Sequence, residues 1–190
     1  MGKKHITVSL VVTISILFTS CGGDTKDTSE QTTESSEQAP PPTPPDKPQC
    51  ELKPNANCIN ADLSGKNLSG LVLPGIDFSG ANLEGALLNN TVLVGADLSN
   101  SNLAGAQLAN TNLSSANLME ITAPGALFNR ADLSNALLLR ADLNTTVFLE
   151  TDLRSANLTG ALLAGLVDKG ASWCNTIYSD GKLKNDNCQE

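Results

Sequence analysis

Five cysteines are the most reactive side chains in this sequence of 190 residues, and their placement is uneven. They stand at Cys21, Cys50, Cys58, Cys174 and Cys188. Cysteines with nearby histidines would indicate a metal site or a Cys-His nucleophile, but the sole histidine, His5, lies near the N-terminus, and the cysteine spacings are not those of close zinc-binding pairs. We therefore expect no metal, no cofactor and no histidine-dependent catalysis.

Carboxylates are the other groups that could perform chemistry. A pair of Asp or Glu side chains can hydrolyse a glycosidic bond. Here the carboxylates recur at one position of a short repeat, for example Asp62, Asp97, Asp132 and Asp142, where turn and ladder formation accounts for them. A carboxylate-based hydrolase stays open as an alternative that would need a cleft. The prediction is that the protein is not an enzyme, and the sequence identifies no small-molecule substrate.

The repeat occupies residues 61–165 and sets the position of everything else. Taken in steps of five from Leu63 to Leu163, all positions are Leu or Phe except Ala123. A small residue stands two positions earlier, Asp or Asn often stands one position earlier, and Gly or Asn often stands two positions later, which gives the consensus A-[DN]-L-x-G. A helix would need apolar residues at steps of three and four, and a strand at steps of two. A period of five therefore indicates a solenoid that turns a corner in every repeat.

This pattern resembles the pentapeptide-repeat family. The resemblance implies an all-β fold, a right-handed quadrilateral β-helix with four pentapeptides per coil and about five coils, in which the Leu/Phe and the small residue point inward. Residues twenty apart should then stack. Two pairs of opposite charge have this separation, Glu120 with Arg140 and Arg130 with Glu150.

The N-terminus has the build of an export signal. Two lysines precede an apolar run from Ile6 to Phe18, and small residues precede Cys21. Residues 1–20 resemble a bacterial lipoprotein signal peptide, which implies that Cys21 is lipidated and attaches the protein to a membrane. The alternative is an ordinary secretory signal with an incidental cysteine. Gly22 after the cysteine favours the outer membrane, so the expected location is the bacterial cell envelope.

The remaining segments are a linker and two caps. Residues 21–49, rich in Ser, Thr, Glu and Pro, are expected to form the lipid anchor and a disordered tether. In an oxidising compartment, nearest-neighbour disulfides would join Cys50 to Cys58 and Cys174 to Cys188. They would close an N-terminal cap over residues 50–60 and a C-terminal cap over 166–190, whose Asp180-Gly181 indicates a hairpin turn. The stretch 173–188 also resembles the C-terminal caps of exported pentapeptide-repeat proteins.

Charge and surface apolarity suggest the kind of partner. The formal charge is −8, and the chain without its signal is more acidic still, so no nucleic-acid interface is expected. Apolar residues in outward positions form two candidate interaction surfaces, one of Met119, Leu137 and Leu139 and one of Leu127, Val147 and Leu149. The predicted function is a non-enzymatic envelope lipoprotein that presents a rigid rod to an unknown protein partner or gives structural support. An acidic DNA-mimic that regulates a DNA-binding enzyme is an alternative, disfavoured by the export signal.

Overall fold

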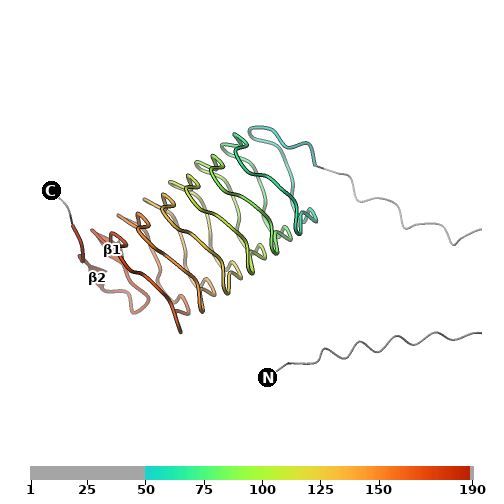
Figure 1. Cartoon of the computed structure of the whole chain (residues 1–190). Helices are drawn as coiled ribbons and strands as arrows, with labels where there is room; N and C mark the ends of the chain where they lie inside the picture. The colour runs from blue at the N-terminus through green and yellow to red at the C-terminus, as the bar shows by residue number, and fades with distance from the viewer. Residues whose placement is uncertain (1–49, 189–190) are drawn as a thin grey trace, which may run out of the picture. The chain divides into compact units, whose positions relative to one another are not determined.

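The computed structural model describes residues 50–188 as a β-solenoid. The expected signal, the lipidation site Cys21 and the tether lie outside the described residues. Figure 1 shows the described chain as coils stacked along one axis, from the cyan first coil to the red C-terminal hairpin. Parallel bridges join one residue of each pentapeptide to the residue twenty positions on, as in Asn57 to Asp77 and Val147 to Val167. One coil therefore consists of four pentapeptides.

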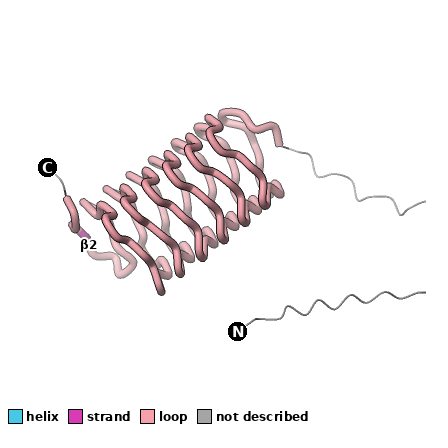
Figure 2. Tube along the Cα trace, viewed as in Figure 1, coloured by secondary structure: helices cyan, strands magenta, loops and turns pink. Residues whose placement is uncertain are grey.

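Regular strands are confined to the C-terminal end. Strand β1 is Thr176–Ile177 and strand β2 is Leu183–Lys184, and they pair antiparallel with Thr176 opposite Lys184. The rest of the described chain consists of single bridges and turns, which Figure 2 draws as loop. A side of the coil is too short to form a longer strand, because only one residue separates each bridge from the two-residue turn that follows it.

The core is a column of side chains from the two inward positions of each repeat. Leu83, Leu103 and Leu143 are fully buried, as are the small residues between them. The same geometry continues beyond the predicted repeat segment. Cys58 and Trp173 occupy the central position of their pentapeptides and are buried, and the bridges run from Asn57 to Ile177. The regular stack thus extends into both segments that the sequence suggested were caps.

One repeat exchanges its two inward residues without leaving the stack. Ile121 stands in the small position and Ala123 in the central position, and both are buried. Thr122 between them keeps its bridges to Asn102 and Asp142. The larger and smaller side chains compensate in volume, so the exchange keeps the core filled.

The fifth position of each repeat turns the corner with a positive φ. Glycine takes this conformation without steric cost, and asparagine takes it more readily than most residues. Arg130 and Glu150 adopt it with φ of 57° and 54°, although neither residue type favours it. Their side chains pair, with Arg130 Nε 2.7 Å from Glu150 Oε2. Glu120 and Arg140 form the corresponding pair at another corner, so both ion pairs predicted from the twenty-residue offset are confirmed.

Buried hydroxyls add bonds between successive coils. Thr91, Thr111 and Thr151 each point inward and donate to a carbonyl oxygen 23 residues earlier, at 2.6 to 3.0 Å. A buried hydroxyl that is bonded in this way avoids the cost of an unpaired polar group. The inward threonines therefore tie one coil to the coil before it.

Candidate interaction surface

The outward side chains of the solenoid form rows, because each bridge places a residue directly over the one twenty positions earlier. Two rows contain the apolar residues predicted from the sequence. We call them the Leu137 row and the Val147 row. The Leu137 row is Asn57, Asp77, Asp97, Asn117, Leu137, Asn157 and Ile177, and the Val147 row is Asn67, Leu87, Gln107, Leu127, Val147 and Val167.

The Leu137 row has a single strongly apolar point in its middle. Leu137 is 42% exposed and is bridged to Asn117 on one side and Asn157 on the other. Met119 and Leu139, which follow the row on adjacent coils, are half-buried. The structure brings these three predicted residues together, and the ion pair of Glu120 with Arg140 lies beside them.

The Val147 row is a longer apolar strip. Leu127 and Val147 are bridged to one another and half-buried, and the strip continues to Val167, which is 46% exposed. Leu149 lies in the turn after Val147. Val167 was not predicted as part of this surface, although it is an apolar residue in the position that usually holds Asp or Asn, which is a signal in the sequence.

Two further apolar residues outside both predicted surfaces are more exposed. Val72 is 60% exposed near the first coil and Leu162 is 56% exposed on the last. Both occupy the usual Asp/Asn position, like Val167. Each end of the described solenoid therefore presents exposed apolar side chains, whereas the two predicted surfaces contain only residues from the middle of the sequence.

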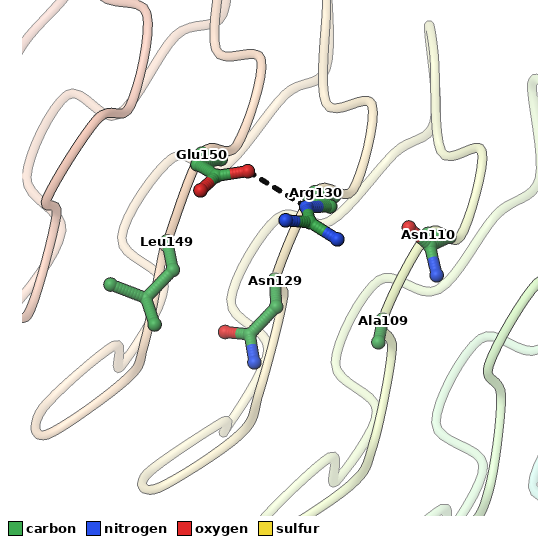
Figure 3. Close-up of a pocket in the computed structure, with 6 residues that line it drawn as sticks. All are labelled: Ala109, Asn110, Asn129, Arg130, Leu149 and Glu150. Atoms are coloured by element: carbon green, nitrogen blue, oxygen red, sulfur yellow. Dashed lines mark hydrogen bonds and ion pairs between the residues drawn. The ribbon is translucent and has the colours of Figure 1, made fainter.

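A shallow depression of about 290 Å³ lies beside the Val147 row (Figure 3). It is lined by Ala109, Asn110, Asn129, Arg130, Leu149 and Glu150. Ala109 is smaller than the residues stacked after it, Asn129 and Leu149, and this leaves space between the coils. Asn129 Oδ1 is buried there without a hydrogen-bond partner among the described residues. A hydrogen bond from Arg130 holds the pKa of Glu150 below its usual value, so this corner stays ionised.

The carboxylates considered for catalysis shape turns instead. Asp62, Asp97, Asp132 and Asp142 each accept a hydrogen bond from the backbone N–H two residues later. They lie on three rows, with Asp62 and Asp142 on the same row but four coils apart, and they converge on no common point. Partial burial acts to raise the pKa of Asp97, but hydrogen bonds from Ser99 and Asn117 outweigh it, and the pKa is lowered. These side chains stabilise turns.

The four cysteines of the described segment are joined in the two pairs expected. The Cα atoms are 4.9 Å apart in Cys50–Cys58 and 5.1 Å apart in Cys174–Cys188. In residues 50–188 no group of three or more His, Cys, Asp or Glu side chains is placed to hold a metal ion. Nor does that segment contain a helix long and apolar enough to span a bilayer.

The C-terminal end contains an aromatic cluster. Phe128, Phe148, Trp173 and Tyr178 follow one another with ring centres 5.4 to 6.5 Å apart and edge-on geometry. Lys184 of β2 covers this cluster, with its Nζ 4.0 Å from the centre of the Trp173 ring and 3.4 Å from Asp168 Oδ2. Hydrophobic packing and a cation over an aromatic face thus hold the hairpin on the stack.

Comparison with known proteins agrees with this geometry. The description "Pentapeptide repeats" matches in eight copies, over residues 55–90, 91–118 and 126–165. The interval between the last two ranges contains the repeat in which Ile121 and Ala123 are exchanged. The chain belongs to the pentapeptide-repeat family.

Solved structures give the same class of fold. The chain is similar to the pentapeptide repeat protein Rfr23 from the cyanobacterium Cyanothece 51142, at 30% identity over 59% of this chain and 90% of that chain, with a TM-score of 0.58. It also matches a pentapeptide repeat protein from the thylakoid lumen of Arabidopsis thaliana, at 27% identity over 63% of this chain and 69% of that chain, with a TM-score of 0.35. QnrB1, a plasmid-mediated fluoroquinolone resistance protein, matches at 22% identity over 63% of this chain and 64% of that chain, with a TM-score of 0.39. No curated protein matches the sequence.

Proposed function

We propose that this protein is a non-enzymatic lipoprotein of the bacterial cell envelope that presents a rigid solenoid to a protein partner. Cys21 would carry the lipid, residues 21–49 would be the tether, and the solenoid would be the part that the partner contacts. The proposed rod is a right-handed quadrilateral β-helix with a disulfide-bonded segment at each end.

One observation carries the interaction role: the candidate catalytic groups of the described segment have structural roles, whereas apolar side chains remain on its outside. The carboxylates accept backbone hydrogen bonds in turns, and the cysteines are paired. Apolar outward residues instead form the continuous strip of Leu127, Val147 and Val167. A strip of this kind, bordered by charged residues, is typical of a protein-binding surface.

The Val147 row is the preferred face for the partner. It has the longest apolar strip, and it borders the depression in which Arg130 and Glu150 occupy corners that suit glycine better. A partner side chain could enter the space above Ala109 and donate a hydrogen bond to the unpaired Asn129 Oδ1. The second apolar surface, around Leu137, is narrower and is flanked along its row by asparagines.

Lipidation is tested by metabolic labelling. A fatty-acid label should enter the wild-type protein and be lost in Cys21→Ser, which should also leave the membrane fraction. Cys50→Ser is the matched control, because it removes a cysteine without touching the proposed attachment site. Membrane retention of Cys21→Ser, equal to that of the wild type, would contradict the anchor.

Partner contact is tested separately by photo-cross-linking in cells. A photo-reactive residue at Val147 should give a discrete adduct, whereas the same residue at Thr122, an exposed position on another row, should give none. Adducts at both positions, or at neither, would argue against the Val147 row. This result does not depend on whether Cys21 is lipidated.

A further inference from the structure

The Val147 row lies on one of the four sides of the solenoid. This side, which we call the Val147 side, consists of the pentapeptides 66–70, 86–90, 106–110, 126–130, 146–150 and 166–170. Four of the six residues in its row are Leu or Val, whereas the described rows of the other sides hold one or two apolar residues each. The Val147 side is therefore the most apolar side of the described solenoid.

Charge also sets this side apart. The Val147 side carries Lys66, Arg130 and Lys169 against Glu150 and Asp168, which gives a formal charge of +1. Arg130 and Glu150 pair with each other, and the other three charges lie at the two ends of the side, so its middle is neutral. The other three sides, counted in the same way over residues 51–180, carry −3, −3 and −1. A partner that is itself acidic meets the least repulsion on the Val147 side.

The spacing of the row limits the kind of partner that can follow it. Successive residues of the row are bridged and lie about 4.8 Å apart along the solenoid axis. A helix laid along the axis repeats its side chains about every 5.4 Å, and an extended strand about every 6.6 Å, so over five steps they drift by about 3 Å and about 9 Å. A β-sheet whose strands run along the coils has the same spacing and stays in register. A second copy of the solenoid provides such a sheet.

The two edges of the Val147 side have complementary heights. At one edge the corner residues carry side chains, and Figure 3 shows Asn110, Arg130 and Glu150 in line there. At the other edge the corner residues are Gly85, Gly105, Gly125, Thr145 and Gly165. A Cβ atom added to any of the first three glycines would meet open space. One edge is therefore a ridge of side chains, and the other is a low corner of nearly bare backbone.

We propose that the partner on the Val147 row is a second copy of this protein, packed side by side and pointing in the same direction. The second copy is turned by half a turn about an axis parallel to the solenoid, so the ridge of each copy lies along the low corner of the other. Val147 then faces Val147 and Leu127 faces Leu127, as in two stacked sheets. Arg130 lies over Gly125 of the second copy, so equal charges stay apart. This arrangement rests on the proposed function, which supplies the face.

The opposite direction fits less well. If the second copy pointed the other way, ridge would meet ridge, and Leu149 and Arg130 would hold the two apolar rows apart. The two low corners would also meet and leave a gap. The parallel arrangement in addition places Cys50 of both copies at the same end, from which both proposed tethers would run to one membrane.

A second copy supplies a donor for the buried Asn129 Oδ1. This oxygen borders the depression above Ala109 and has no hydrogen-bond partner among the described residues. Gln107 belongs to the same pentapeptide as Ala109 and is exposed. Its Oε1 accepts a hydrogen bond from Asn89, which leaves its Nε2 to donate. In the parallel arrangement Gln107 of the second copy lies opposite this pentapeptide, and its amide enters the depression.

Photo-cross-linking at Val147 identifies the partner by mass. In cells that express the full chain, a photo-reactive residue at this position should give an adduct of twice the mass of the chain. An adduct with a different protein would overturn the second copy as partner and leave the proposed function standing. Absence of any adduct would contradict both the proposed face and the second copy.

A second cross-link tests the direction of the two copies. Purified full chains in detergent, isotopically light and heavy, are mixed so that links between copies can be recognised. A photo-reactive residue at Leu87 should link to residues 66–110 of the other copy. Links to residues 126–170 would overturn the parallel arrangement.

Sedimentation equilibrium of the full chain in density-matched detergent measures the association. The contact is small, so we expect a dimer that forms reversibly between about 1 and about 300 µM. Leu127→Asn with Val147→Asn should weaken dimerisation at least about tenfold, because it removes four apolar side chains from the contact. Asn is a usual residue of the repeat at this position, so the variant keeps the fold. The matched control, Val72→Asn with Leu137→Asn, makes the same change on two other sides and should dimerise like the wild type.

Each result decides the matter. A wild type that stays monomeric over this range, or a Leu127, Val147 variant that dimerises as well as the wild type, would overturn the proposal, and so would an equal loss in the control. A circular dichroism spectrum and melting temperature equal to those of the wild type would show that the variant is folded. If it is not, Gln107→Glu replaces it, because this change at an exposed position sets two equal charges against each other across the contact and should weaken dimerisation likewise.

Discussion

In the last coil, residues 171–180 lie under a strand and residues 161–170 do not, although both halves have the same inward pattern below them. The covered half, residues 171–180, contains Trp173 under the ammonium group of Lys184, a disulfide, and side-chain amides that bond to the backbone. The open half, residues 161–170, has its turn bonds, its bonds to the coil before it, and the ion pair of Asp168 with Lys184. The difference shows that the repeat residues are sufficient for one coil to stack on another. Covering the last coil requires other residue types.

The two halves of the last coil also differ in the interactions that stabilise them. Over the open half the stabilising interactions are those of any internal coil, with one neighbour missing. Over the covered half, further stabilisation comes from the hairpin. Its Lys184 contacts Trp173, Tyr178 and Asp168. Because Asp168 belongs to the open half, this lysine also connects the two halves.

Removing the central side chain of each half should give the largest contrast. Trp173→Ala deletes a fully buried aromatic residue between Phe148 and Tyr178, and it should lower the free energy of unfolding by about 3–5 kcal/mol. Leu163→Ala removes a half-buried side chain and should cost under about 2 kcal/mol. Denaturant unfolding followed by circular dichroism measures both. Equal losses would mean that the hairpin adds nothing to the packing of the last coil.

Opening the C-terminal disulfide should loosen the covered half first. Cys174→Ser with Cys188→Ser removes the constraint that holds residues 182–188 on the coil and should cost about 2–4 kcal/mol. Hydrogen exchange should rise over residues 173–188, next over 153–165, and last over 93–103, because a solenoid frays from its ends. Cys50→Ser with Cys58→Ser is the control, and it should leave exchange at the C-terminal end unchanged. Uniform exchange along all coils would contradict this order.

Much of the solenoid could be predicted because nearly every pentapeptide has the same residue types at its inward positions. Leu or Phe every five residues, with a small residue two positions before it, defines the inward positions, and the twenty-residue coil then predicted the pairs Arg130–Glu150 and Glu120–Arg140. These features depend on neighbours at fixed separations. A period in the sequence therefore contains nearly all the information needed to place them.

The C-terminal end of the solenoid could not be predicted in the same way, because its structure depends on where the chain stops following the five-residue repeat. The sequence indicated a hairpin at Asp180-Gly181, but the turn comes after two sides of the coil, and only the three-dimensional path shows that residues 161–170 stay uncovered. The position of Trp173 in a central slot could have been noticed, since Ala171 stands two residues before it as in the repeat consensus. The contact of Lys184 with Asp168 has no sequence signal.

Lys184 should be the next most sensitive residue after the disulfide. Lys184→Met keeps the apolar stem over Trp173 but removes the cation from the ring and from Asp168, and it should cost about 1–2 kcal/mol. Because Trp173 is the sole tryptophan, its fluorescence reports directly on the covered half. Lys182→Met is the matched control, since Lys182 is exposed and pairs only with Asp180 within its own turn. A similar effect of both changes would remove the reason for assigning Lys184 a role between the two halves.

The smallest expected effect is a dependence on acid pH from Asp152, which is bridged to Ser172 at the start of the covered half. Partial burial acts to raise its pKa, but hydrogen bonds and the charge of Arg154 lower it below the ordinary value of 3.8. A carboxyl whose pKa is depressed by folding stabilises the native state above its ordinary pKa, and this contribution is lost as the pH falls through the folded-state pKa. We therefore expect wild-type Trp173 fluorescence to report a loss of stability below about pH 4, and Asp152→Asn to flatten that part of the profile. The change should stay under about 1 kcal/mol because the pair with Arg154 is largely exposed. Arg154→Gln should shift the loss to higher pH, whereas a profile unchanged by either substitution would show that this carboxylate does not support the covered half.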